Sequence, residues 1–168
     1  MVGIIGVITC PALATTLQPW EAVKSDPLMR AMEEDLAKRP QVDFPLTHNF
    51  INGPDGKPFF YIRTIFMPAD MEITTKIHKT RHPFWITKGK VGVYQAGGGM
   101  EILEAGHIGI TEPGTWRALH IYEDTIWTTF HATELTDPKA VVDSITEPHD
   151  VPELTYKKEP QALAEAGL

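Results

Sequence analysis

Short runs of strand-forming residues, separated by turn-forming residues, fill the middle of this chain and constrain its fold more than any other feature. The segments 53–57, Gly-Pro-Asp-Gly-Lys, and 112–115, Glu-Pro-Gly-Thr, are typical of these separators. Turn signals spaced by about 8–12 residues favour a β-sandwich or barrel over a helical fold. We therefore predict one mainly β domain, a small antiparallel barrel. The 168 residues leave room for extensions at both ends.

Two glycine-containing segments are interpreted as turns of this barrel. Gly89 supplies the positive φ of a tight turn at 88–90. The run 96–99, Ala-Gly-Gly-Gly, lacks the Lys-Ser/Thr pair and the following helix of a phosphate loop, so we interpret it as a hairpin tip. In chain order, strands are expected at 47–52, 58–66, 71–78, 83–86, 91–95, 100–103, 107–111, 116–122 and 125–133.

Aspartate-proline pairs at 26–27 and 137–138 predict the starts of two helices, because Asp is a preferred N-cap and Pro fits the first helical position. In the first helix, Leu28, Met32 and Leu36 recur every four residues and predict its packing face. The acidic run 33–35 is then expected on the solvated face. A weaker helix is expected at 161–166.

The predicted organisation has three parts. Residues 1–45 form an N-terminal arm and helix, residues 46–133 form the barrel, and residues 134–168 form a C-terminal helical extension. The arm begins with strand formers that include Val2, Ile4 and Ile5. Two interpretations of the arm stay open: it packs on its own barrel, or it packs on a neighbouring subunit.

A cluster of basic residues and histidines lies in the stretch 76–117. Lys76 and His78 are two residues apart, so on a strand they share one face. His82 begins the next apolar run after a short connection. We expect the inward-facing positions of the barrel to come from this stretch.

The spacing of this stretch resembles the two motifs of the cupin superfamily, G-x5-H-x-H-x3,4-E-x6-G and G-x5-P-x-G-x2-H-x3-N. Lys76-x-His78-x3-His82-x6-Gly89 keeps the first spacing, and the second is kept by Gly106, Gly114 and Arg117. The proline of the second motif falls one place late, at 113. The resemblance covers 60–132 and implies a single cupin-like jelly-roll β-barrel. More loosely, the runs 106–111 and 125–131 resemble cupin-domain proteins encoded in phage genomes.

The metal motif of this family is degenerate here. Where cupins place His, His, Glu and His on the metal, this chain has Lys76, His78, His82 and Arg117. Each cation about 4 Å from a unit positive charge costs about 4 kcal/mol at an effective dielectric of 20, and a divalent ion doubles the cost. We therefore expect no cofactor. If a divalent metal is bound, its candidate ligands are His78, His82 and His131. His120 is left out, because side-chain alternation from Arg117 places it on the opposite face of the strand.

Lys76 and Arg117 are instead candidates for an anion pocket, since cationic side chains, Arg above all, bind carboxylates and phosphates. The alternative is that both side chains reach out from the barrel rim and pair with Glu101, Glu104 or Glu112.

Composition narrows the possible partners. The net charge is −7 with no basic block, which excludes non-specific nucleic-acid binding. We find no apolar run near the roughly 20 residues of a membrane helix. Cys10 is the single cysteine, so one chain has no disulfide framework, and we see no nucleophilic triad. We predict a cytoplasmic protein, or a virion protein if it is phage-encoded.

Three functional hypotheses follow. The first is a non-catalytic cupin-fold assembly protein that associates with itself or with other structural subunits, such as a phage virion structural or decoration subunit. The second is a metal-dependent cupin enzyme, of dioxygenase or isomerase type, with an atypical His site. The third is a small-anion binding module. The degenerate ligand set makes an enzyme the less favoured hypothesis.

Overall fold

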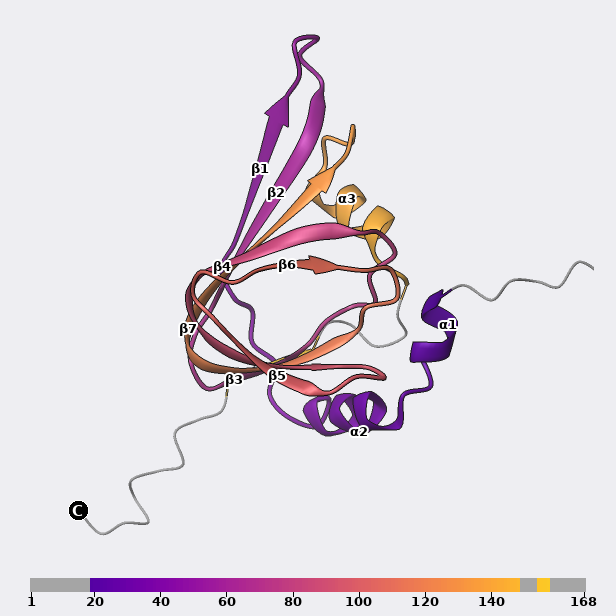
Figure 1. Cartoon of the computed structure of the whole chain (residues 1–168), viewed down its shortest axis with the longest axis vertical. Coiled ribbons are helices and arrows are strands. Elements are labelled where there is room, and N and C mark those ends of the chain that lie inside the picture. The colour runs from indigo at the N-terminus through magenta and orange to yellow at the C-terminus, as the bar shows by residue number, and fades with distance from the viewer. Residues whose placement is uncertain (1–18, 149–153, 158–168) are drawn as a thin grey trace, which may run out of the picture.

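The computed structural model describes residues 19–148 and 154–157, which form one curled eight-stranded antiparallel sheet with three short helices (Figure 1). The prediction of a mainly β fold, an antiparallel sheet curled into a barrel with short helices outside it, is confirmed. In chain order the elements are α1 Pro19–Val23, α2 Pro27–Leu36, β1 Leu46–Asn52, β2 Pro58–Met67, β3 Met71–Thr74, β4 His82–Gln95, β5 Met100–Glu104, β6 Ile108–Thr111, β7 Arg117–Ala132, α3 Pro138–Ile145 and β8 Leu154–Lys157.

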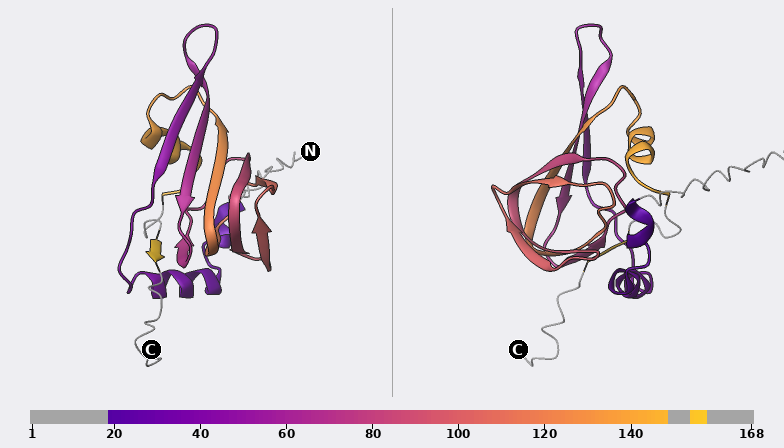
Figure 2. Two further views of the ribbon diagram at one scale, coloured as in Figure 1. Left: turned by 90° about the vertical axis from the view of Figure 1, so that its left-hand side faces the viewer. Right: turned by 45° about the vertical axis from the view of Figure 1, so that its right-hand side comes forward.

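Strand β7 is the centre of the sheet, because β2, β3 and β4 all pair with it. The sheet continues from β2 to β1 and from β3 to β8, while β4 also pairs with β5 and β6. Figure 2 shows the sheet curling round on itself, with the β1–β2 hairpin projecting beyond the barrel. The run 96–99 is the tip of the β4–β5 hairpin, as predicted.

The tight turn predicted at Gly89 is wrong. Strand β4 runs through this position without stopping, and its register against β7 shifts there. Gly89 does have a positive φ, of 91°, but a Cβ on it would lie 2.4 Å from the carbonyl oxygen of Asp124 in β7. The two strands predicted at 116–122 and 125–133 are likewise one long strand, β7. Strands β4 and β7 therefore bend together at this contact, and each pairs with different neighbouring strands before and after the bend.

The core fills the inside of this curve with inward-facing apolar side chains. Trp127 stacks on Phe84 at a ring-centroid distance of 4.5 Å. Burial of such side chains stabilises the fold by about 1.5–3 kcal/mol each. The buried cluster consists of Met67, Met71, Ile73, Phe84, Ile86, Val91, Val93, Leu103, Leu119, Ile121 and Trp127.

The cap of α2 is confirmed, and so are two of the three residues of its predicted packing face: Leu36 is buried, and Met32 packs partly buried against the cluster around Trp116, whereas Leu28 does not. The Asp26 side chain accepts a hydrogen bond from the backbone N–H of Met29. Leu28 is 45% exposed, whereas Met29 is fully buried against the cluster around Trp116. Glu33, expected on the solvated face, is only 4% exposed. The spacing of four does not distinguish this face from its neighbour, because a helix repeats every 3.6 residues.

The C-terminal extension is not purely helical. Asp137 caps α3 as predicted, accepting from the N–H of Ala140. Strand β8 then pairs with β3 and adds an edge to the sheet. The arm and the helix expected at 161–166 lie outside the described residues, and the proposed domain boundaries stay predictions. No described helix is long and apolar enough to cross a membrane.

Candidate functional site

A cavity of about 60 Å³ lies inside the barrel, at the place where the sequence suggested a site. Its walls bring together Lys76, His78, His82 and Arg117, the four residues at the family's ligand positions. Arg63 of β2 lines the same cavity. No Asp or Glu is among its described lining residues, so the charged groups in its wall are all cations.

Arg117 is the innermost of these cations. It begins β7, and its side chain is turned into the barrel with only 6% of the residue exposed. One Nη1–H donates to Thr111 Oγ1 at 3.0 Å, and the guanidinium carbon lies 5.2 Å from the Phe84 ring and 5.9 Å from the Trp127 ring. Burial lowers the pKa of Arg117 from its ordinary 12.5 to about 10. The charge is therefore held away from water beside the stacked rings of Phe84 and Trp127.

The alternative of a rim-exposed Arg117 paired with a glutamate is wrong. Arg117 is buried, and two of the three expected partners bind other residues on the surface, while the charge of the third, Glu101, acts on Arg117 and raises its pKa against the effect of burial. Glu104 pairs with Lys90 at 2.9 Å, and Glu112 pairs with Arg81 at 3.0 Å. Lys76 is half-buried at the cavity wall.

Three histidines stand in a row beside the cavity. The ring centroids of His78 and His82 are 4.9 Å apart, and those of His82 and His131 are 4.2 Å apart. His82 begins β4, and His131 comes from the far end of β7. The strand expected to carry His78 ends at Thr74, so His78 is held by an isolated bridge to Thr146.

All three imidazoles are held neutral. Burial is the main cause that lowers each pKa: well below the usual value for His78, below it for His82, and to about 3 for His131. The Arg117 charge lowers the pKa of His78 and His82 further. Among the described residues, no hydrogen-bond partner meets His78 Nδ1, His82 Nε2 or His131 Nδ1.

The residues present do not fit the metal that a cupin fold implies. Three neutral imidazole nitrogens are suitable donors. However, the cavity wall offers no carboxylate, and the Arg117 charge acts on the two histidines that would have to hold a dication. Within residues 19–148 and 154–157, no group of three His, Cys, Asp or Glu has an arrangement that could hold a metal. That the protein carries no metal stays a prediction.

Arg63 and Thr111, two residues of the cavity wall, were not identified from the sequence. Arg63 faces inward between Tyr61 and Ile65, and period-two alternation from those apolar residues would have pointed to it. Thr111, the partner of Arg117, carries no comparable signal. His120 points to the other face, as alternation predicted.

No family model matches the sequence, and comparison with curated proteins found no match. The solved structures that resemble this fold include ectoine synthase from P. lautus, with 12% identity and a TM-score of 0.48, covering 67% of this chain and 82% of that chain. An uncharacterized conserved protein with a double-stranded β-helix domain from Klebsiella pneumoniae has 18% identity and a TM-score of 0.45, with coverages of 61% and 90%. The Schizosaccharomyces pombe Cnp3 cupin domain has 19% identity and a TM-score of 0.43, with coverages of 58% and 66%.

Proposed function

We propose that the barrel cavity binds a small oxyanion, a carboxylate or a phosphate, through Arg117. The observation that carries this proposal is a buried guanidinium in a cavity whose described lining has no carboxylate. Desolvating an ion costs several kcal/mol, and attraction to a partner offsets that cost only when the geometry is good. A bound anion would supply that partner.

The surrounding charges favour the same ligand class. Lys76 and Arg63 line the cavity with Arg117, and a guanidinium can present two parallel N–H groups to an oxyanion. Arg117 uses one Nη1–H on Thr111, which fixes the plane of the guanidinium. The cavity volume of about 60 Å³ limits the ligand to a few non-hydrogen atoms.

Calorimetric titration with phosphate and with acetate, at constant ionic strength set by chloride, tests the proposal. We expect saturable binding of at least one anion by the wild-type chain and its loss in Arg117→Met. Arg81→Met is the matched control, because Arg81 is a surface arginine, 69% exposed at its side chain, in an ion pair outside the cavity. Equal binding by the Arg117 and Arg81 variants, or no binding by the wild type, would refute an anion site at Arg117.

Self-association is a second candidate function, supported by the outer face of the sheet. Ile108 is 67%, Ile110 47% and Trp85 42% exposed, although apolar patches on monomers are usually small. Registered pairs Trp85↔Ile108 and Pro83↔Ile110 place these side chains side by side on β4 and β6. Such a face supports the non-catalytic assembly hypothesis.

Light scattering after size-exclusion chromatography tests self-association. We expect a homo-oligomer that Ile108→Lys weakens while circular dichroism stays unchanged. A wild-type monomer at tens of micromolar would contradict it. The more specific hypothesis of a phage virion or decoration subunit also stays a proposal, because the apolar arm that motivated it lies outside the described residues.

A further inference from the structure

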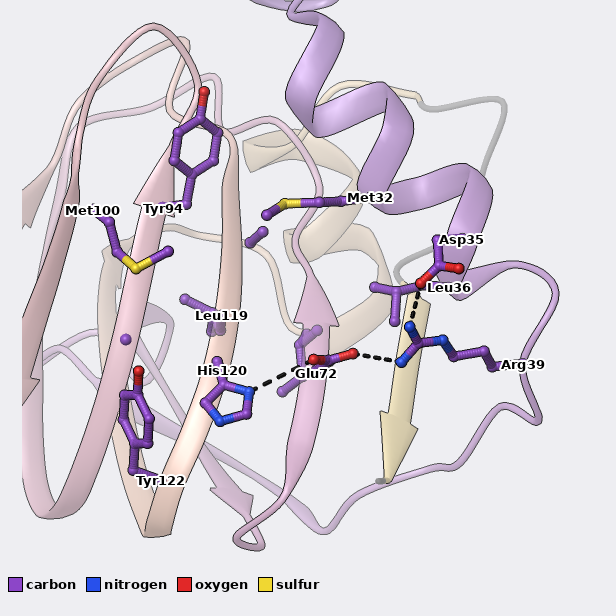
Figure 3. A pocket seen from close by; sticks show the side chains of 13 residues that line it. Met32, Asp35, Leu36, Arg39, Glu72, Tyr94, Met100, Leu119, His120 and Tyr122 are labelled. Carbon is purple, nitrogen blue, oxygen red and sulfur yellow. Dashed lines mark hydrogen bonds and ion pairs between the residues drawn. The ribbon is translucent and has the colours of Figure 1, made fainter. Parts of the chain in front are cut away.

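A second pocket lies outside the barrel, between α2 and the outward-facing side chains of β3, β4, β5 and β7 (Figure 3). Its volume is about 410 Å³, within the usual range of about 300–1,000 Å³ for small-molecule sites. Neither the barrel cavity nor the sequence motifs account for it.

One outward-facing position in the floor of the pocket has no side chain. Gly92 of β4 pairs with Ile102 on one side and His120 on the other, and His120 pairs in turn with Glu72. The Tyr122 ring lies against the backbone of Gly92 and forms part of the floor there. Gly92 has no positive φ, so its backbone does not require glycine, and a Cβ there would meet the Tyr122 ring at 3.0 Å.

Helix α2 is anchored at both ends of the pocket. At its start, Asp26 accepts hydrogen bonds from the Gly97 N–H at 2.9 Å and from the Tyr94 hydroxyl at 3.4 Å. Just past its end, Arg39 Nη1 donates to Glu72 Oε2 at 2.6 Å. These contacts bound the gap beneath the middle of the helix at both ends.

The pocket has an apolar end and an acidic end. Tyr94, Tyr122 and two methionines, Met32 and Met100, form the apolar end, as Figure 3 shows. The faces of tyrosine rings and the polarisable sulfur of methionine make favourable contacts with planar aromatic ligands and with cations.

At the acidic end Glu72 is only partly satisfied. Its Oε2 accepts from Arg39, but within the described part of the chain its Oε1 has only His120 Nδ1 nearby, at 3.6 Å, beyond a normal hydrogen bond. Arg39 is already committed, since it also pairs with Asp35 and lies 5.0 Å from the Tyr156 ring. The group left to meet a ligand is thus a carboxylate oxygen beside aromatic rings.

We propose that this pocket binds a small planar aromatic cation, such as an aryl amidine or an aminopyridine, with its ring against Tyr94 and Tyr122 and its charged nitrogen at Glu72. The site is independent of the anion cavity, because it lies between α2 and the outer face of the sheet and its acidic end has the opposite charge preference.

Three probes of nearly the same shape test the charge preference: benzamidine, benzamide and benzoate, each titrated at millimolar concentration and followed by amide NMR shifts. We expect saturable shifts at Gly92, Tyr94 and His120 with benzamidine, several-fold weaker binding of benzamide, and none of benzoate. Glu72→Gln should reduce benzamidine affinity to that of benzamide. Glu104→Gln is the matched control, because Glu104 pairs with Lys90 outside the pocket.

Gly92→Val should abolish binding of benzamidine and benzamide, because its strand-compatible side chain would displace the Tyr122 ring that forms part of the floor. The amide spectrum of Gly92→Val away from the pocket shows whether this variant has folded. If it has not folded, the affinity of Glu72→Gln for benzamidine tests the proposal instead. The proposal is overturned by benzoate binding as tightly as benzamidine, by an absence of saturable shifts, or by benzamidine binding that survives in a folded Gly92→Val protein.

Discussion

Replacing Arg117 by Met should leave the stability of the protein nearly unchanged while it removes anion binding. The pKa of Arg117 falls from 12.5 to about 10 through burial, which corresponds to a cost of about 3 kcal/mol for holding the charge in the fold. Both values lie well above neutrality, so this cost is fully present at pH 7. The charged hydrogen bond to Thr111 contributes roughly 1.5–3 kcal/mol, and the contacts with Phe84 and Trp127 contribute roughly 0.5–2 kcal/mol.

These opposing terms nearly cancel, and burial of the Met side chain replaces the burial of the Arg117 stem, so it adds little. We therefore expect Arg117→Met to change the free energy of unfolding by less than about 1 kcal/mol, measured by urea denaturation at pH 7 with tryptophan fluorescence. Arg81→Met should stay within about 0.5 kcal/mol of the wild type. Phosphate at about 100 times its dissociation constant should stabilise the wild type by about 2.7 kcal/mol but leave Arg117→Met unchanged. A loss of more than about 1 kcal/mol in Arg117→Met would show that the guanidinium is a structural group and refute this reasoning.

Three further predictions concern stability. Met29→Ala should cost about 2–5 kcal/mol in denaturant melts and Leu28→Ala less than about 0.5, because only Met29 is buried; equal costs would contradict the packing face of α2. The pKa of His131 falls to about 3 in the folded chain, so the unfolded chain binds more protons between that value and 6.5. The free energy of unfolding should therefore drop on acidification through this window, by about 3 kcal/mol at pH 4.5. The drop should be smaller in His131→Leu. Gly89→Ala should cost more than Gly97→Ala, since both have positive φ but only Gly89 lies 2.4 Å from a neighbouring carbonyl at its Cβ position; similar melting temperatures would argue against the bend contact.

Local periodicity predicted some of the side chains that line the cavity, but not Arg63 or Thr111. Alternation placed Lys76 and His78 on one face and His120 on the other without knowledge of the fold, although Lys76 and His78 lie past the end of β3 at Thr74. The cavity contains the first two, and the outer pocket contains the third. The ligand roles of these residues remain predictions.

Features that depend on distant pairing could not be predicted in this way. A glycine with positive φ serves a turn or a bend equally well, and only the approach of Asp124 makes Gly89 a bend. The outer pocket depends on Gly92 lying opposite His120, a register that β4 and β7 set across many intervening residues. The burial of Arg117 beside the stacked pair of Phe84 and Trp127 likewise follows from the curvature of the whole sheet.

Locating a bound oxyanion tests the central claim most directly. Crystals of the wild-type protein soaked in selenate, a tetrahedral oxyanion with an anomalous scattering signal, would show where such an ion binds. We predict an anomalous peak inside the barrel within hydrogen-bond distance of the Arg117 guanidinium, and its absence in crystals of Arg117→Met. Peaks confined to surface lysines and arginines, with none beside Arg117, would contradict the assignment of the barrel cavity as an anion site.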